Sequence, residues 1–195
     1  MNSHPQKSAL VIIDYINEII DPKGKLAGKG YAAFDEKHKT LDKVRGLIEI
    51  ARRKQFPIFF VRIGFSPSYV EQPESSPLFG GAKKFGALQL GSWATEFHPK
   101  VAPSSSDMVI NKHRVSAFYG TPLDIVLKKH EISDVFIAGV ATDLAVQSAA
   151  RDAHDRDYNV IVVSDCCAAA SDEDHETSLR VMGKIAKVIT LKDIP

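Results

Sequence analysis

The chain has 195 residues, of which 44% are hydrophobic and 25% charged, with 25 Lys and Arg against 24 Asp and Glu. These proportions are typical of a globular protein and exclude disordered, collagen-like and coiled-coil chains. The net charge of +1 provides no field that would attract nucleic acid or an anionic membrane. The composition therefore favours a small molecule as the partner.

The length suits a single domain, 1–195, because no repeat or linker divides the chain. The only cysteines, Cys166 and Cys167, are adjacent and cannot form a stabilising disulfide, which is consistent with a reducing compartment. The apolar run before Asp14 is too short for a signal peptide or a membrane span. We therefore expect a cytoplasmic protein.

Apolar runs that do not alternate with polar residues predict strands covered on both faces. Such runs occupy 9–13, 58–63, 107–110, 134–138, 159–163 and 186–190. Between them, apolar residues at helical spacing predict helices over 35–54, 122–130, 142–157 and 171–184. This order predicts an α/β fold with a parallel sheet and helices on both faces.

In a parallel sheet the carboxyl ends of the strands meet at one edge, and ligands bind outside that edge near the point where the strand order reverses. The side chains expected there are those of Asp14, Arg62, Lys112, Ala145 and Asp165. Asp14 and Lys112 each have an ordinary structural interpretation, as a loop-fixing carboxylate and a solvated surface lysine. Together at this edge, they form a candidate acid–base pair.

The segment 65–106 is rich in Pro, Ser and Gly and carries several aromatic residues, among them Phe65 and Trp93. A loop of this length in a compact domain is usually a lid, a binding loop or disordered, and the aromatic residues favour a pocket wall or an interface between subunits. The histidines share no metal-binding spacing, so we expect neither a metal nor a cofactor. The adjacent cysteines are typical of small core residues rather than nucleophiles.

Four segments at predicted strand ends resemble the isochorismatase-like hydrolases, also called cysteine hydrolases. They are Leu10 to Asp14, Lys112 to Phe118, Gly139 to Ala153, and Val163 to His175. The resemblance covers nearly the whole chain. It implies a three-layer α/β/α sandwich around a six-stranded parallel sheet, assembled as a homodimer or homotetramer.

In that family the catalytic triad is Asp, Lys and Cys, and the resemblance places these roles at Asp14, Lys112 and position 145. The chain has Ala145 there, which carries no nucleophile. The resemblance also implies a cis peptide bond between Val140 and Ala141. The backbone N–H groups of Ala141 and Ala145 would then be the donors to an oxyanion.

Three functions remain open. In the first, a water replaces the missing thiol and Asp14 is a general acid, as in family members that hydrolyse a vinyl ether without a cysteine. In the second, the protein is a C–N amidohydrolase whose cysteine has been replaced by Ala145, by engineering or by loss. In the third, it is a catalytically silent module that binds a metabolite or a partner. The metal pattern of nicotinamidases is absent, because Asp35 and His38 have the wrong spacing.

Two arginines, Arg62 and Arg114, are candidate anchors for an anionic substrate such as a carboxylate, although ordinary structural pairing explains them equally well. The aromatic residues expected to line the pocket are Phe65, Trp93, Phe118 and Tyr119.

Overall fold

The computed structural model describes residues 7–194. Its six strands pair in parallel, in the order β3-β2-β1-β4-β5-β6. The strands are β1 (Ser8–Ile13), β2 (Ile58–Ile63), β3 (Met108–Lys112), β4 (Asp134–Gly139), β5 (Asn159–Val163) and β6 (Lys187–Ile189). The six-stranded parallel sheet that the sequence predicted is confirmed.

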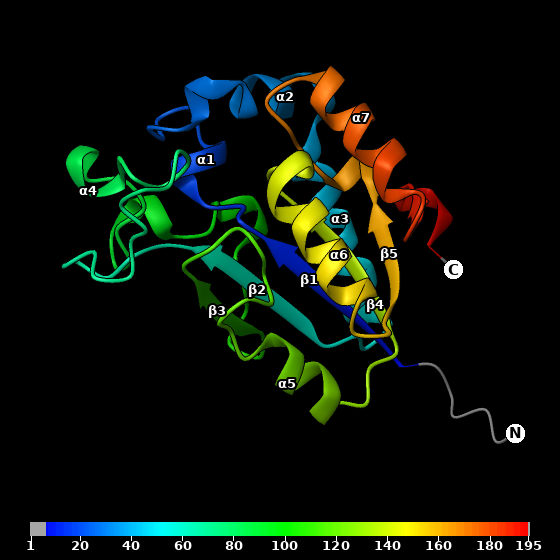
Figure 1. Cartoon of the computed structure of the whole chain (residues 1–195). Coiled ribbons are helices and arrows are strands. Elements are labelled where there is room, and N and C mark those ends of the chain that lie inside the picture. The colour runs from blue at the N-terminus through cyan, green and yellow to red at the C-terminus, as the bar shows by residue number, and fades with distance from the viewer. Residues whose placement is uncertain (1–6, 195) are drawn as a thin grey trace, which may run out of the picture.

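Helices cover both faces of this sheet, which completes the expected three-layer sandwich. They are α1 (Asn17–Ile20), α2 (Tyr31–His38), α3 (Thr40–Arg53), α4 (Ala82–Phe85), α5 (Leu123–Lys129), α6 (Gln147–His154) and α7 (Asp172–Met182). Figure 1 shows α6 and α7 in front of the strands and α3 behind them. No helix within residues 7–194 has the length and apolar character needed to cross a bilayer.

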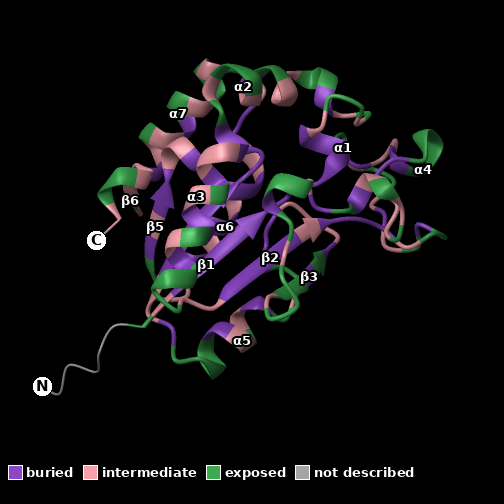
Figure 2. Cartoon of the chain, turned by 180° about the vertical axis from the view of Figure 1, so that it is seen from behind, coloured by how far each residue is buried: buried purple, intermediate pink, exposed green. Residues whose placement is uncertain are grey.

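The core lies on both faces of the central strands. Ala9 to Ile13 of β1 are completely buried, and so are Phe60 and Val61 of β2. In Figure 2 these two strands are coloured as buried along most of their length. A strand with a helix layer on each face has no solvent-facing side, which is why these runs do not alternate.

Two predicted elements have different boundaries in the structure. The helix expected over 35–54 is two helices, because Lys39 adopts a left-handed conformation with φ of 55° between α2 and α3. The strand expected over 107–110 extends to Lys112, so this lysine ends β3 instead of lying in a loop. Strand pairing with β2, in which Ile63 lies opposite Lys112, fixes its position.

The strand order reverses between β1 and β4, because the chain moves outward from β1 to β2 and β3 and then returns to β4. A crevice at the carboxyl ends of the strands is expected at this point. Asp14 follows β1 directly and Val140 follows β4. The sheet topology therefore places these two segments side by side.

Candidate active site

Asp14 is held at the end of β1 by backbone geometry and by two hydrogen bonds. Its φ of 60° turns the chain away from the strand direction. The side chain is buried, and its Oδ1 accepts a hydrogen bond of 2.6 Å from the backbone N–H of Ile63. Its Oδ2 lies 2.8 Å from the Nζ of Lys112. Each carboxyl oxygen therefore has one strong donor.

Lys112 is also completely buried, with 1% of its side chain exposed. Besides its contact with Asp14, its Nζ donates to the backbone oxygens of Arg114 at 3.1 Å and Val115 at 3.0 Å. An ammonium group has three hydrogens, and three acceptors surround this one. The turn after β3 thus fixes the lysine head group in one orientation.

Burial raises the pKa of Asp14 above its ordinary value. The cation of Lys112 and the two hydrogen bonds act in the opposite direction, but loss of hydration is the larger effect. The sequence alone could not decide between these opposing influences. In the structure, the net result is a raised pKa for this carboxyl group.

A tight corner follows β4. A Cβ on Gly139 would lie 2.9 Å from the Cβ of Ile13 and 2.9 Å from the Cγ2 of Val146, so this close approach requires glycine. The next peptide bond, between Val140 and Ala141, is cis. The sequence predicted a regular helix from Thr142, but residues 142–146 form a π-helical turn and α6 begins only at Gln147.

The π-helical turn leaves a backbone donor at the site. The N–H groups of Leu144 and Val146 both donate to the oxygen of Ala141. The Ala141 N–H itself has no acceptor among residues 7–194. Ala141 and Ala145 both line the adjacent pocket. An unpaired N–H beside a pocket is suited to stabilise a developing negative charge.

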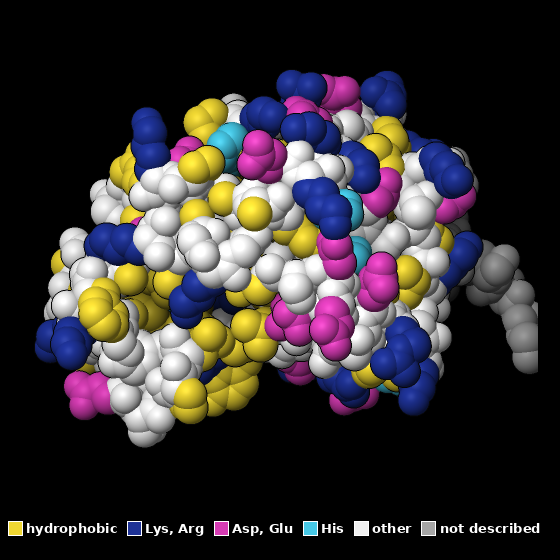
Figure 3. Space-filling model, turned by 90° about the horizontal axis from the view of Figure 1, so that it is seen from above, with side chains coloured by type: hydrophobic (Ala, Val, Ile, Leu, Met, Phe, Trp, Pro, Cys, Tyr) yellow, Lys and Arg dark blue, Asp and Glu magenta, His cyan; other side chains and the backbone are white. Residues whose placement is uncertain are grey.

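Asp14, Lys112 and Ala145 line one pocket, whose volume is about 580 Å³ when the open solvent at its mouth is included. Most of its wall is apolar, including Leu26 from the segment after α1 and Phe79 from the loop between β2 and β3. Figure 3 shows the molecule from above, relative to Figure 1. On this face, hydrophobic side chains border a hollow, and Lys or Arg side chains lie beside it. The structure therefore brings the three residues of the expected triad to one pocket.

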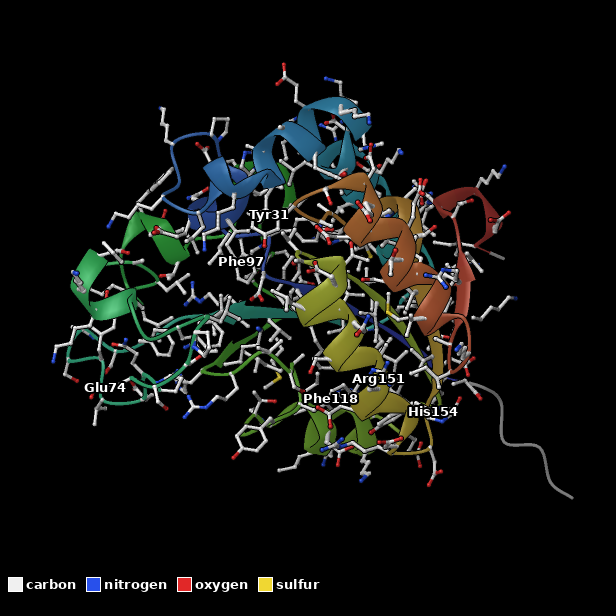
Figure 4. The ribbon with its side chains drawn as sticks, turned by 45° about the horizontal axis from the view of Figure 1, so that its top comes forward. Tyr31, Glu74, Phe97, Phe118, Arg151 and His154 are labelled. Atoms are coloured by element: carbon white, nitrogen blue, oxygen red, sulfur yellow. The ribbon has the colours of Figure 1, made fainter. Side chains whose placement is uncertain are left out.

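Two polar residues of the pocket, Lys29 and Tyr31, were not identified from the sequence. Figure 4 shows Tyr31 between the α1–α2 segment and the start of α6. The signal that could have found them is Gly30 between them. Gly30 has φ of +116°, which marks a turn that glycine favours, and it ends the stretch 21–30, which contains three Gly and three Lys.

The two arginines expected to anchor a substrate do not line the pocket. Arg62 donates to the Oδ1 of Asn111 and to the oxygen of Thr95, and its guanidinium group lies over the ring of Phe97. Arg114 donates to the backbone oxygens of Glu71 and His113. Both guanidinium groups are engaged in structural contacts, which was the alternative interpretation of these residues.

The four aromatic residues expected in the pocket also lie outside its lining. Phe65 is completely buried and stands behind the wall, where its ring contacts that of Phe79. Trp93 and Tyr119 are exposed to solvent. Phe118 packs against Tyr158, and Figure 4 shows it near the end of α6 that is remote from Tyr31. The loop 65–106 nevertheless contributes Leu78, Phe79 and Leu88 to the wall.

The two native thiols do not reach this pocket. Cys166 and Cys167 are buried, and burial raises the pKa of Cys167 to about 12. The pKa of Cys166 is raised for the same reason. Because the thiolate is the reactive form, neither group can replace a nucleophile at position 145.

We expect the folded protein to resist thiol reagents. At pH 8, 5,5′-dithiobis(2-nitrobenzoate) should label neither cysteine within minutes, whereas both of the two thiols should react in guanidinium chloride. Absorbance of the released thiolate measures this directly. Rapid labelling of the folded protein would show that one of these cysteines is accessible.

Within residues 7–194, no three side chains of His, Cys, Asp or Glu are grouped in a way that could hold a metal ion. Asp165, which was expected at the same sheet edge, does not line the pocket, and its Oδ1 accepts a hydrogen bond from the N–H of Leu191.

Comparison with known proteins gives a consistent result over the whole fold. The family model described as "Isochorismatase domain" matches residues 8–193. The uncharacterized isochorismatase family protein YecD of Escherichia coli O157:H7 is 33% identical, over 96% of this chain and 94% of that protein.

Two solved structures are similar in both sequence and fold. N-carbamoylsarcosine amidase from Thermoplasma acidophilum has a TM-score of 0.76 at 32% identity, and the alignment covers 97% of this chain and 99% of that one. Pyrazinamidase/nicotinamidase from Streptococcus mutans has a TM-score of 0.77 at 28% identity, with 94% of this chain and 100% of that one covered.

Proposed function

The chain belongs to the isochorismatase family, and we propose that it hydrolyses a small metabolite with Asp14 and Lys112 as its acid–base pair and a water molecule as the nucleophile. The observation that carries this proposal is the buried Asp14–Lys112 pair facing Ala145 across one pocket. A methyl group at position 145 leaves room for water where a thiol would stand.

The raised pKa of Asp14 supports its role as a general acid. One lone pair on each carboxyl oxygen accepts a hydrogen bond, which leaves another on each oxygen for a proton. Once the proton has left, the carboxylate lies 2.8 Å from the ammonium group of Lys112. The lysine therefore stabilises the state that follows proton transfer.

A vinyl ether illustrates the chemistry that this pair could perform. Asp14 protonates the terminal alkene carbon, which forms a C–H bond and leaves an oxocarbenium ion. Water adds to the cationic carbon and returns one proton to Asp14. The resulting hemiketal breaks its C–O bond to give a ketone and an alcohol, so that one water is consumed and the carboxyl group is regenerated.

If Asp14 acts as the acid, kcat/KM should be constant at low pH and fall as the pH rises through the raised pKa of this group. The protonated form is the active one, so the loss lies on the alkaline side. In Lys112→Met the cation no longer lowers this pKa, and the fall should move to higher pH. A pH–rate profile of both proteins tests this, and a rate that rises through the same range would contradict it.

A second candidate, amide hydrolysis, is favoured by the two amidases among the similar structures. The pocket retains an acid, a lysine and a free backbone N–H beside position 145. These groups suit acyl transfer once a thiol is present. The parent protein should be assayed with isochorismate, simple enol ethers, ureides and amides. Turnover of the vinyl ethers would support the first function, because only vinyl-ether hydrolysis requires no thiol.

A further inference from the structure

We propose that the pocket takes a substrate that carries a carboxylate, and that Lys29, with Tyr31 beside it, is the receptor for this group. The inference rests on the proposed function in one respect only, which is that the pocket at Asp14 and Lys112 is the substrate site. It concerns which small molecules enter and how they are oriented.

The polar groups of the pocket are few. Among its fifteen lining residues, only Asp14, Lys29, Tyr31 and Lys112 have polar side chains. The rest of the wall is hydrocarbon or aromatic. In a pocket of this type a small number of polar groups fixes the orientation of the ligand. Any charged group on the substrate must therefore find its partner among these four side chains.

Lys112 is not available for that role, because its ammonium group already faces Asp14 and two backbone oxygens. Lys29 is different. Within residues 7–194 its Nζ makes no hydrogen bond and no ion pair. It is therefore the uncommitted cation of the pocket.

The charges of the lining residues add up to a positive pocket in either protonation state of the acid. When Asp14 is ionised it offsets Lys112, and the charge of Lys29 remains. When Asp14 is protonated, both lysines remain uncompensated. A low-dielectric wall strengthens this field, which favours entry of an anion.

Tyr31 supplies a neutral donor in the same pocket as this cation. Burial raises the pKa of its phenol, and the O–H has no acceptor among the described residues. A carboxylate has two oxygens, so it can accept from an ammonium group and from a phenol at the same time. Lys29 and Tyr31 are separated by one residue and therefore belong to the same part of the rim.

The backbone between the two residues is fixed by a close contact. Gly30 has φ of +116°, and a Cβ at this position would lie 2.1 Å from the backbone oxygen of Ala170. A short 3₁₀ turn, Ala27–Lys29, precedes it and α2 begins directly after it. Only glycine fits here, so the rim that carries Lys29 and Tyr31 is anchored to the segment before α7.

A matched pair of probes tests the inference without turnover. Benzoate and benzamide are planar, have nearly the same size and differ by one charge. Calorimetric titration at low ionic strength should show that the parent protein binds benzoate at least about fivefold more tightly than benzamide. Lys29→Met should abolish this preference, and Lys29→Arg should retain it. The preference should also weaken in 0.5 M NaCl.

Lys23→Met is the matched control, because Lys23 lies in the same loop but does not line the pocket. It should leave the preference unchanged. Equal affinity of the parent for the two probes, no binding of benzoate, or a preference that survives in Lys29→Met would overturn the inference. A parent protein that prefers benzoate but hydrolyses nothing would instead contradict the proposed function, so the two failures are distinct.

Discussion

Replacement of Asp14 by Asn is expected to lower kcat by a factor of about 10²–10⁴, because the amide keeps the shape of the side chain but cannot give up a proton to the substrate. The effect should appear in kcat more than in KM, since the rest of the pocket wall is unchanged. Steady-state kinetics on a substrate turned over by the parent protein measure both constants.

The same substitution should also destabilise the fold. It leaves the ammonium group of Lys112 buried without a counter-charge, and breaking a buried pair in this way costs about 3–5 kcal/mol. Urea unfolding followed by circular dichroism would report this loss. Low activity of Asp14→Asn could therefore arise from chemistry or from partial unfolding, and a second variant is needed to separate them.

The double variant Asp14→Asn/Lys112→Met provides that separation. Replacing both partners removes the uncompensated charge, so much of the lost stability should return. Activity should not return with it, because the acid is still absent. Asp42→Asn, which affects only solvent-exposed ion pairs, is the matched control and should change neither quantity. A stable and active double variant would rule out Asp14 as the acid.

The second large effect is expected from Ala145→Cys. The new thiol would enter the pocket beside the buried pair, where the ammonium group of Lys112 and the free N–H of Ala141 favour a thiolate. It should be alkylated by iodoacetamide at neutral pH, unlike the native thiols. Loss of a nucleophile from a comparable catalytic unit costs about 10⁶-fold in turnover. Restoring one should therefore raise amide hydrolysis by at least about 10²-fold.

Ala145→Ser is the control for size and polarity, and it should gain little because its hydroxyl group is a much weaker nucleophile. Amidase activity confined to the Cys variant would support the second candidate function. Turnover of a vinyl ether by the parent protein would support the first. If neither the parent protein nor Ala145→Cys turns over any of these substrates, but ligand binding is measurable, a binding module would be favoured. An unreactive thiol at position 145 would show that this position does not face the substrate.

Much of the fold could be predicted because the strands are covered on both faces. Runs such as 58–63 and 159–163 are predicted with their observed boundaries. Most of their residues are apolar and buried, and each run contains only one polar residue, Arg62 or Asn159. The break at Lys39 could not be found in this way. A lysine in the left-handed region has no sequence signature, because tertiary contacts impose that conformation.

The contact between Asp14 and Lys112 could also be predicted, because the ends of parallel strands are brought together by topology alone. The prediction that Asp14 and Lys112 lie at one edge required only that their strands belong to one parallel sheet. The other side chains that line the pocket could not be inferred in the same way. Phe65 and Trp93 belong to a long loop, and whether a loop side chain points inward or outward depends on contacts far away in the sequence. The same reason explains why Lys29 was missed.

The ion pair between Asp14 and Lys112 joins the end of a central strand to the end of the edge strand β3, past β2. The pair therefore links two strands of the sheet, in addition to its proposed acid–base role. Neither partner can be lost alone without leaving a buried charge. A descendant that abandoned catalysis is therefore expected to keep both residues or to lose both together. Their presence in a genome sequence therefore identifies the fold before it identifies an enzyme. No ion pair depends on the side chain at position 145. Substitutions that change the reaction catalysed by proteins of this fold are therefore expected at this position.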